Sequence, residues 1–185
     1  EMQRSLVGSE MCIRDSIRLS RLDEGVRGEV TPVDLTALIQ HCVQKLTPAA
    51  QNAQVSISAS GNDPVLISGD HALLEEMLTN LLENGIKYNH AGGYVRARAE
   101  MADGRAVVTV ADNGVGIAPE DQQRVFERFY RVDKSRSKQT GGTGLGLSIV
   151  KHGAQVHHAQ IAMQSALGEG TTITLTFPAQ SSGKK

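Results

Sequence analysis

The chain has 185 residues, 39% of them hydrophobic, which fits one domain with an ordinary core and leaves little room for a second. Its 19 basic and 20 acidic residues nearly cancel, so neither nucleic acid nor an anionic membrane is expected as a partner. The cysteines, Cys12 and Cys42, lack a CxxC spacing, which argues against a disulfide framework or a structural zinc site. No apolar run approaches the roughly 18 residues of a membrane-spanning helix.

The first part of the chain is interpreted separately from the rest. Leu6-Val-Gly-Ser-Glu-Met-Cys-Ile-Arg-Asp-Ser16 resembles the translation of a transposase adapter used in preparing sequencing libraries, and it back-translates into that adapter in one unbroken frame. The alternative is a native helical segment. We expect residues 1–16 to derive from the adapter, which would leave Cys12 without a role.

Two helices and two strands are predicted next. Ile17, Leu19 and Leu22 have the spacing of the last turns of an amphipathic helix, which Gly25 would end. A second helix is predicted from Pro32 to Pro48, where apolar residues recur at helical spacing: Leu35, Leu38, Ile39, Val43 and Leu46. Residues 55–59 and 64–68 are predicted to be strands that meet in a hairpin-like connection.

Residues 71–88 are predicted to form a helix with two distinct faces. Asp70 can cap it, and its apolar stripe consists of Leu74, Met77, Leu78, Leu81 and Gly85. Beside the stripe, Asn80, Asn84 and Lys87 follow one another at helical spacing. Amide oxygens suit Mg²⁺ and a lysine suits phosphate, although a solvated helix face would give the same pattern.

Residues 93–111 are predicted to form two strands around a turn at Asp103-Gly104. Asp112-Asn-Gly-Val-Gly-Ile117 follows directly. An aspartate at a strand end can accept a hydrogen bond from an exocyclic amine, and glycines let the backbone approach a flat ligand. A tight turn capped by Asp112 is the alternative.

The connection from Asp112 to Gly146 is longer than loops usually are. It is rich in basic residues, namely Arg124, Arg128, Arg131, Lys134, Arg136 and Lys138. Gly141-Gly-Thr-Gly-Leu-Gly-Leu-Ser148 then opens into a predicted helix to His158 and could cradle phosphates, or could be only a flexible linker. Strands around Gly168-Glu-Gly170 close the chain. These elements predict an α+β sandwich, with helices on one face of a mixed sheet.

Five motifs resemble, in order and spacing, the nucleotide-binding boxes of bacterial histidine kinases: Asn80–Tyr88, Asp112–Gly116, Phe126–Phe129, Gly142–Gly146 and Gly168–Thr171. The resemblance covers residues 30–180. It implies the Bergerat fold of the GHKL superfamily, a two-layer sandwich with a mixed β-sheet backed by helices and a long ATP lid. Neither a P-loop nor the signatures of eukaryotic-type protein kinases are found in the sequence.

The resemblance implies ATP and Mg²⁺ as cofactors and assigns roles to individual residues. Asn84, with Asn80 as a second candidate, would hold the metal, Lys87 would touch phosphate, and Asp112 would bind the adenine amine. Gly142, Gly144 and Gly146 would wrap the triphosphate, with Arg131 and Arg136 at its end. The other expected nucleotide contacts are Tyr88, Gly114, Gly116, Ile117, Thr143, Leu145, Leu147 and Thr171. Glu83 could orient the acceptor or a water, or could simply face solvent. The expected catalytic set is Asn80, Glu83, Asn84 and Lys87.

The activity implied is transfer of the γ-phosphoryl group from ATP to a histidine, and then to an aspartate on a response regulator. Leu19–Gly25 resembles the end of the second dimerisation helix, so residues 17–29 are expected to be that helix end and a linker. The acceptor histidine would lie on the first dimerisation helix, and none of the six histidines is assigned to this role. The expected partners are therefore the dimerisation domain and a receiver domain.

The expected context is a cytoplasmic domain of a homodimeric, membrane-anchored sensor, with this chain itself a monomer and residues 181–185 a tail. One alternative is a GHKL ATPase, but such hydrolases place a glutamate where Asn80 stands, and an amide cannot take a proton. An anti-sigma-type serine kinase shares the nucleotide boxes but not the dimerisation-helix remnant. Intact boxes argue against a non-catalytic binding module. Gly85 stands where the family often has alanine, which should loosen the helix.

Overall fold

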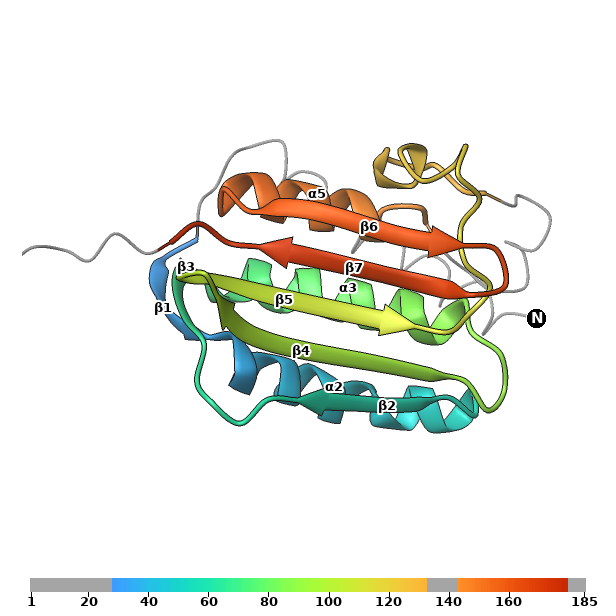
Figure 1. Ribbon diagram of the computed structural model, residues 1–185, viewed down its shortest axis with the longest axis horizontal. Coiled ribbons are helices and arrows are strands. Elements are labelled where there is room, and N and C mark those ends of the chain that lie inside the picture. The colour runs from blue at the N-terminus through green and yellow to red at the C-terminus, as the bar shows by residue number, and fades with distance from the viewer. Residues whose placement is uncertain (1–27, 133–142, 180–185) are drawn as a thin grey trace, which may run out of the picture.

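The computed structural model describes residues 28–132 and 143–179. The expectations for the adapter, the dimerisation-helix remnant, the tail, Arg136 and Gly142 lie outside these ranges. Within them, one mixed sheet is backed by helices α2 (Leu35–Asn52), α3 (His71–Lys87) and α5 (Gly146–Val156), as Figure 1 shows. The expected α+β sandwich is confirmed.

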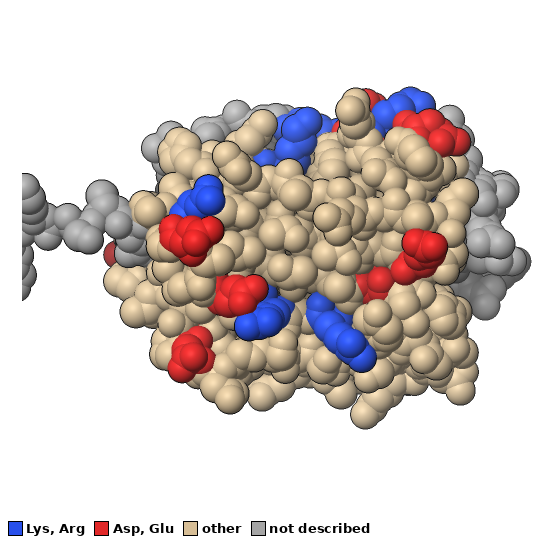
Figure 2. All heavy atoms as spheres, in the orientation of Figure 1, with Lys and Arg blue, Asp and Glu red and all other residues tan. Residues whose placement is uncertain are grey.

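Among the described residues, the sheet has five strands in the order β2-β4-β5-β7-β6. Only β2 and β4 are parallel, and every other neighbouring pair is antiparallel. The strands are β2 (Ser56–Ser60), β4 (Tyr94–Ala102), β5 (Arg105–Asp112), β6 (Gln160–Ala166) and β7 (Gly170–Thr176). Alternate residues such as Val95 and Val108 are buried beneath the helices. The opposite face is open and carries few charged side chains (Figure 2).

The expected hairpin between residues 55–59 and 64–68 is wrong. β2 joins the five-stranded sheet, whereas β3 (Leu66–Asp70) pairs with β1 (Val30–Asp34), a strand that the sequence analysis placed partly in a helix. Asp34 explains the difference, because its carboxylate accepts hydrogen bonds from Thr36 N and Ala37 N, which starts α2 at Leu35, three residues later than expected. The same carboxylate accepts a hydrogen bond from Val65 N at 3.1 Å. This bond holds the residue before β3 beside the end of β1.

Helix α2 also continues past Pro48, where the sequence predicts its end. Proline lacks an N–H and cannot bond to the carbonyl of Gln44. Both residues lie on the exposed side of the helix, where water can hydrate that carbonyl. Beyond the proline, Ala50 is buried in the core, so packing of the last turn offsets the lost hydrogen bond.

The remaining elements agree with the sequence predictions. Asp70 caps α3 by accepting from Leu73 N at 3.1 Å, and the predicted apolar stripe of α3 is buried. The hairpins β4–β5 and β6–β7 form where expected, and α5 lies between them in the chain. Among the described residues, no helix has the length and hydropathy to cross a membrane.

Candidate functional site

Asn80 and Asn84 of the polar row of α3 lie against the first turn of α5. The Asn80 Nδ2 donates to the carbonyl of Glu76 at 2.8 Å, which orients the side chain and leaves its Oδ1 to face α5. A Cβ added to Gly146 would lie 2.9 Å from that Oδ1 and 3.6 Å from the Asn84 Nδ2. The fold therefore brings the glycine-rich segment onto both asparagines, and a side chain at position 146 would require Asn80 to shift.

Lys87 and Arg131 form a positively charged part of the site. Burial lowers the pKa of Lys87, nearby Arg131 lowers it further, and Glu83 acts in the opposite direction. Two cations brought together at a half-buried position favour an anionic ligand that would relieve their repulsion. Glu83 itself is exposed, and the Lys87 ammonium lies 5.2 Å from the centre of the Tyr88 ring.

Asp112 lies at the end of β5, with its carboxylate half-buried. Its Oδ1 accepts from Gly114 N at 2.8 Å and from Thr171 N at 3.3 Å. Burial raises the pKa of Asp112, and these two N–H groups partly oppose the rise. Both hydrogen bonds that the described residues donate to this carboxylate go to Oδ1, so Oδ2 can accept one from a ligand amine.

The glycines after Asp112 are required by the chain's own backbone. A Cβ on Gly114 would lie 2.3 Å from the carbonyl oxygen of Tyr88. Gly116 has a φ of +68°, and a Cβ there would lie 1.8 Å from the carbonyl oxygen of Ala166. The loop thus packs tightly between the end of α3 and the β6–β7 turn. The sequence analysis had explained these glycines by the close approach of a flat ligand.

Ser165 is a site residue that the sequence analysis missed. Its hydroxyl accepts from Ile117 N at 2.8 Å and lies 2.9 Å from the Thr171 hydroxyl. It belongs to no motif, but strand alternation places it on the same inward-facing side as Ile161 and Met163. The sequence signal that could have identified Ser165 is its place in the alternation of the strand, where a serine follows two apolar residues on the same face.

The segments on either side of residues 133–142 meet each other. Phe129 N donates to the carbonyl of Gly144 at 3.0 Å, and a Cβ on Gly144 would lie 2.9 Å from the Phe129 carbonyl carbon. The short helix η1 (Arg124–Phe126) precedes this contact. Of the other expected contacts, Leu145 is buried in the protein, whereas Thr143 and Leu147 are partly exposed.

The described site therefore combines an acceptor group, cations and a helix N-terminus. Asp112 and Thr171 provide the acceptors, and Lys87 with Arg131 the cations. The asparagines of α3 lie beside the N-terminus of α5, whose N–H groups favour anions. This arrangement fits an amine-bearing base linked to a chain of phosphates.

Comparison with known proteins agrees with this geometry. Residues 69–181 match the family described as histidine kinase-, DNA gyrase B-, and HSP90-like ATPase. Sensor-like histidine kinase SenX3 of Mycolicibacterium smegmatis is 42% identical over 167 residues, which cover 90% of this chain and 44% of that protein. The chain thus spans less than half the length of this relative.

Solved structures show the same fold. Mycobacterial sensor histidine kinase MprB matches with a TM-score of 0.68 and 29% identity, over 81% of this chain and 97% of that one. Full-length ShkA in complex with AMPPNP matches with a TM-score of 0.80 and 28% identity, over 96% of this chain and 39% of that one. With a family match over more than half of its length, the chain belongs to the histidine kinase-, DNA gyrase B- and HSP90-like ATPases, as the ATP-binding catalytic domain of a sensor histidine kinase.

Proposed function

We propose that this domain transfers the γ-phosphoryl group of ATP to a histidine on a dimerisation domain, from which it passes to an aspartate of a response-regulator receiver domain. The observation that carries the proposal is the hydrogen bonding and position of the Asn80 side chain. Its amide is held by the Glu76 carbonyl and faces the start of α5. An amide cannot take a proton from water, so the position where a hydrolase needs a base has none.

The imidazole acceptor needs little chemical help, since a neutral imidazole nitrogen is already a good nucleophile. The domain therefore has to position ATP and offset its charge. Asp112 would bind the adenine amine through Oδ2, and Lys87 with Arg131 would bind the phosphates. The loop at Gly144 and the N-terminus of α5 would lie along the triphosphate. Exposed Glu83, next to Asn84, is a candidate for orienting the acceptor.

The same residues fit Mg²⁺. Asn80 Oδ1 and Asn84 Nδ2 both lie beside Gly146, and rotation of the Asn84 amide about its last bond would present its oxygen instead. Neutral amide oxygens are acceptable ligands for a hard cation. Mg²⁺ usually keeps several waters and is held jointly by the protein and substrate phosphates, which suits a site with two amides. When bound, the ion offsets negative charge on the phosphate oxygens.

The proposal extends to the parent protein. We infer a homodimeric sensor in which residues 17–29 connect the dimerisation domain to a cytoplasmic catalytic domain of residues 30–180. In this organisation residues 1–16 are not native sequence, and this chain by itself is a monomer. Recovery of the gene from its source with the same first sixteen codons would contradict the adapter origin, and light scattering would detect a stable dimer.

The test is to incubate the chain with Mg²⁺ and γ-labelled ATP, alone and with a separately purified acceptor domain from a sensor histidine kinase. We expect ATP to be bound and to stay largely intact in the chain alone, and label to appear on the acceptor histidine. Asp112→Asn should abolish binding, whereas the matched Asp103→Asn, in the exposed β4–β5 turn, should not. Rapid release of labelled phosphate without an acceptor would establish a hydrolase instead.

A further inference from the structure

The hydroxyl of Ser165, near the end of β6, joins three separate backbone segments. It accepts from Ile117 N at 2.8 Å and donates to the carbonyl of Gly170 at 2.9 Å. The hydroxyl of Thr171 lies 2.9 Å away. Ser165 therefore connects β6 to the loop after Asp112 and to the strand that begins beside that carboxylate.

The hydrogen-bonding capacity of a hydroxyl determines the direction of the third bond. A hydroxyl has one proton to donate and two lone pairs to accept with. Ser165 uses its proton on Gly170 and one lone pair on Ile117 N. All three contacts can be satisfied together only if the Thr171 hydroxyl donates to Ser165. Thr171 then has no proton left for a ligand and can only accept.

This constraint acts at the end of the site where the base would bind. Thr171 N donates to Asp112 Oδ1 at 3.3 Å, so the Thr171 hydroxyl and the carboxylate belong to one small region. With Ser165 in place, both groups present acceptors there. Adenine has an amine at position 6, whereas guanine and hypoxanthine have a carbonyl oxygen at the same position. Two acceptors favour the amine and repel the carbonyl.

Ser165 also has the support that a positioning role requires. Gln122 Nε2 donates to the carbonyl of Ser165 at 2.8 Å and to the carbonyl of Ile117 at 3.1 Å. Both backbone polar groups of Ile117 are thus held to the same strand end. Gly116 and Ala166 are in direct backbone contact, which leaves the loop little freedom to shift.

We propose that Ser165 is a positioning residue for base specificity: by taking the Thr171 hydroxyl proton, it leaves only acceptors at the base edge and selects a purine with a 6-amino group. This inference rests on the proposed function, since it needs the base to bind beside Asp112. Ser165 touches no base itself and acts through Thr171.

The experiment compares the dissociation constants of ATP and inosine triphosphate, which carries a carbonyl in place of the 6-amine. Titration calorimetry would be performed on the wild-type chain, Ser165→Ala, Thr171→Val and the double variant. Gln164→Ala, at an exposed neighbouring position on the same strand, is the matched control. We expect Ser165→Ala to reduce the preference for ATP by about tenfold, because Thr171 can then donate to the carbonyl. Gln164→Ala should leave the preference unchanged.

In the Thr171→Val background, Ser165→Ala should have no further effect on the ratio of the two constants. A reduced preference that is equally large in that background would overturn the inference, as would an unchanged preference in Ser165→Ala alone. If Ser165→Ala does not fold, Ser165→Cys provides a weaker hydrogen-bonding group of similar size and should give an intermediate ratio. A wild-type chain that binds neither nucleotide would refute the proposed function as well, whereas normal ATP binding with an unaltered ratio would refute only the role of Ser165.

Discussion

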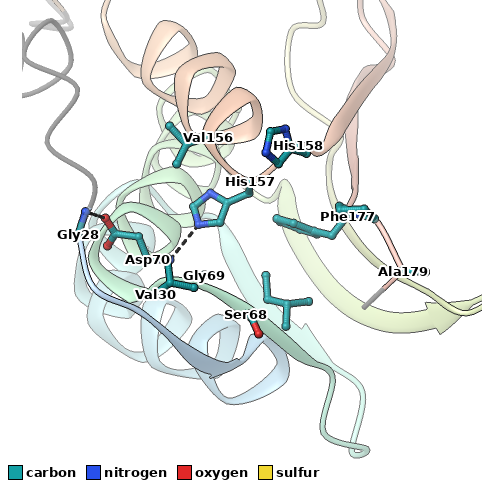
Figure 3. Close-up of a pocket in the computed structure, with 12 residues that line it drawn as sticks. Gly28, Val30, Ser68, Gly69, Asp70, Val156, His157, His158, Phe177 and Ala179 are labelled. Carbon is teal, nitrogen blue, oxygen red and sulfur yellow. Dashed lines mark hydrogen bonds between the residues drawn. The ribbon is translucent and has the colours of Figure 1, made fainter. Parts of the chain in front are cut away.

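The ring of His157 accepts a hydrogen bond from the backbone N–H of Asp70 at 3.0 Å and thereby joins the end of α5 to the start of α3 (Figure 3). The accepting atom is Nε2, so the proton is on Nδ1, which donates to the carbonyl of Gly153 at 2.7 Å. The Asp70 carboxylate in turn accepts from Gly28 N at 3.0 Å. Gly28, Asp70 and His157 line a pocket, which lies at the opposite end of α3 from Lys87.

Replacing His157 should therefore loosen the packing of α5 on α3. We expect His157→Asn to lower the free energy of unfolding by about 1–3 kcal/mol, because a partly buried N–H and a carbonyl lose their partner. Urea unfolding followed by circular dichroism measures the change. His158→Asn is the matched control, since His158 is exposed and has a φ of +53°, which asparagine tolerates. Equal losses in the two variants would contradict the bridging role.

Asp112 should be costly for stability when it is ionised. Burial holds its pKa above the ordinary value, so the folded chain binds a proton more tightly than the unfolded chain does. Stability should consequently fall as the pH rises from the unfolded pKa through the folded one. Asp112→Asn keeps an oxygen for Gly114 N and Thr171 N but carries no charge, so this fall should be reduced. The test is to measure the urea midpoints of the wild-type chain and Asp112→Asn between pH 3 and pH 7, about the range in which a carboxyl titrates. Parallel plots of midpoint against pH for the two proteins would contradict the prediction.

Lys87 should bind phosphate rather than base. We expect Lys87→Met to weaken ATP binding by about 10- to 100-fold and to leave adenosine binding nearly unchanged, because a charge-assisted contact is lost. Since burial and Arg131 lower the Lys87 pKa, ATP affinity should begin to fall at a pH below that of an ordinary lysine. Lys45→Met, on the exposed surface of α2, is the control. A similar loss for adenosine would indicate that the substitution disrupts the fold.

Gly146 should accept a methyl group only at a cost in stability. Its backbone has no strained φ, so alanine would be suitable there by helix propensity alone. The added Cβ would nevertheless lie 2.9 Å from Asn80 Oδ1, and overpacking of this kind costs about 1–3 kcal/mol. The cost should largely disappear in an Asn80→Ala background. Urea denaturation of the two single variants and the pair gives the coupling, and additive losses would exclude the predicted contact.

Gly85 shows how a local argument and a tertiary contact can disagree. Sequence reasoning treats it as a weak point of α3, because glycine is a poor helix former. In the fold, a Cβ at Gly85 would lie 3.0 Å from both methyl groups of Val95 and 3.5 Å from the Asp112 Cβ. The glycine allows α3 to approach β4 and the base-binding carboxylate closely.

The sequence by itself predicted α3, the β4–β5 and β6–β7 hairpins, and the order of the nucleotide motifs. These features depend on periodicity and turn residues within short segments, which can be seen without a fold. Only the tertiary structure decided that β3 pairs with β1, that α2 continues through Pro48, and that Ser165 and His157 have partners. Ser165 is 48 residues from Ile117, and His157 is 87 from Asp70. Such contacts follow from which surfaces pack together, and no local period encodes them.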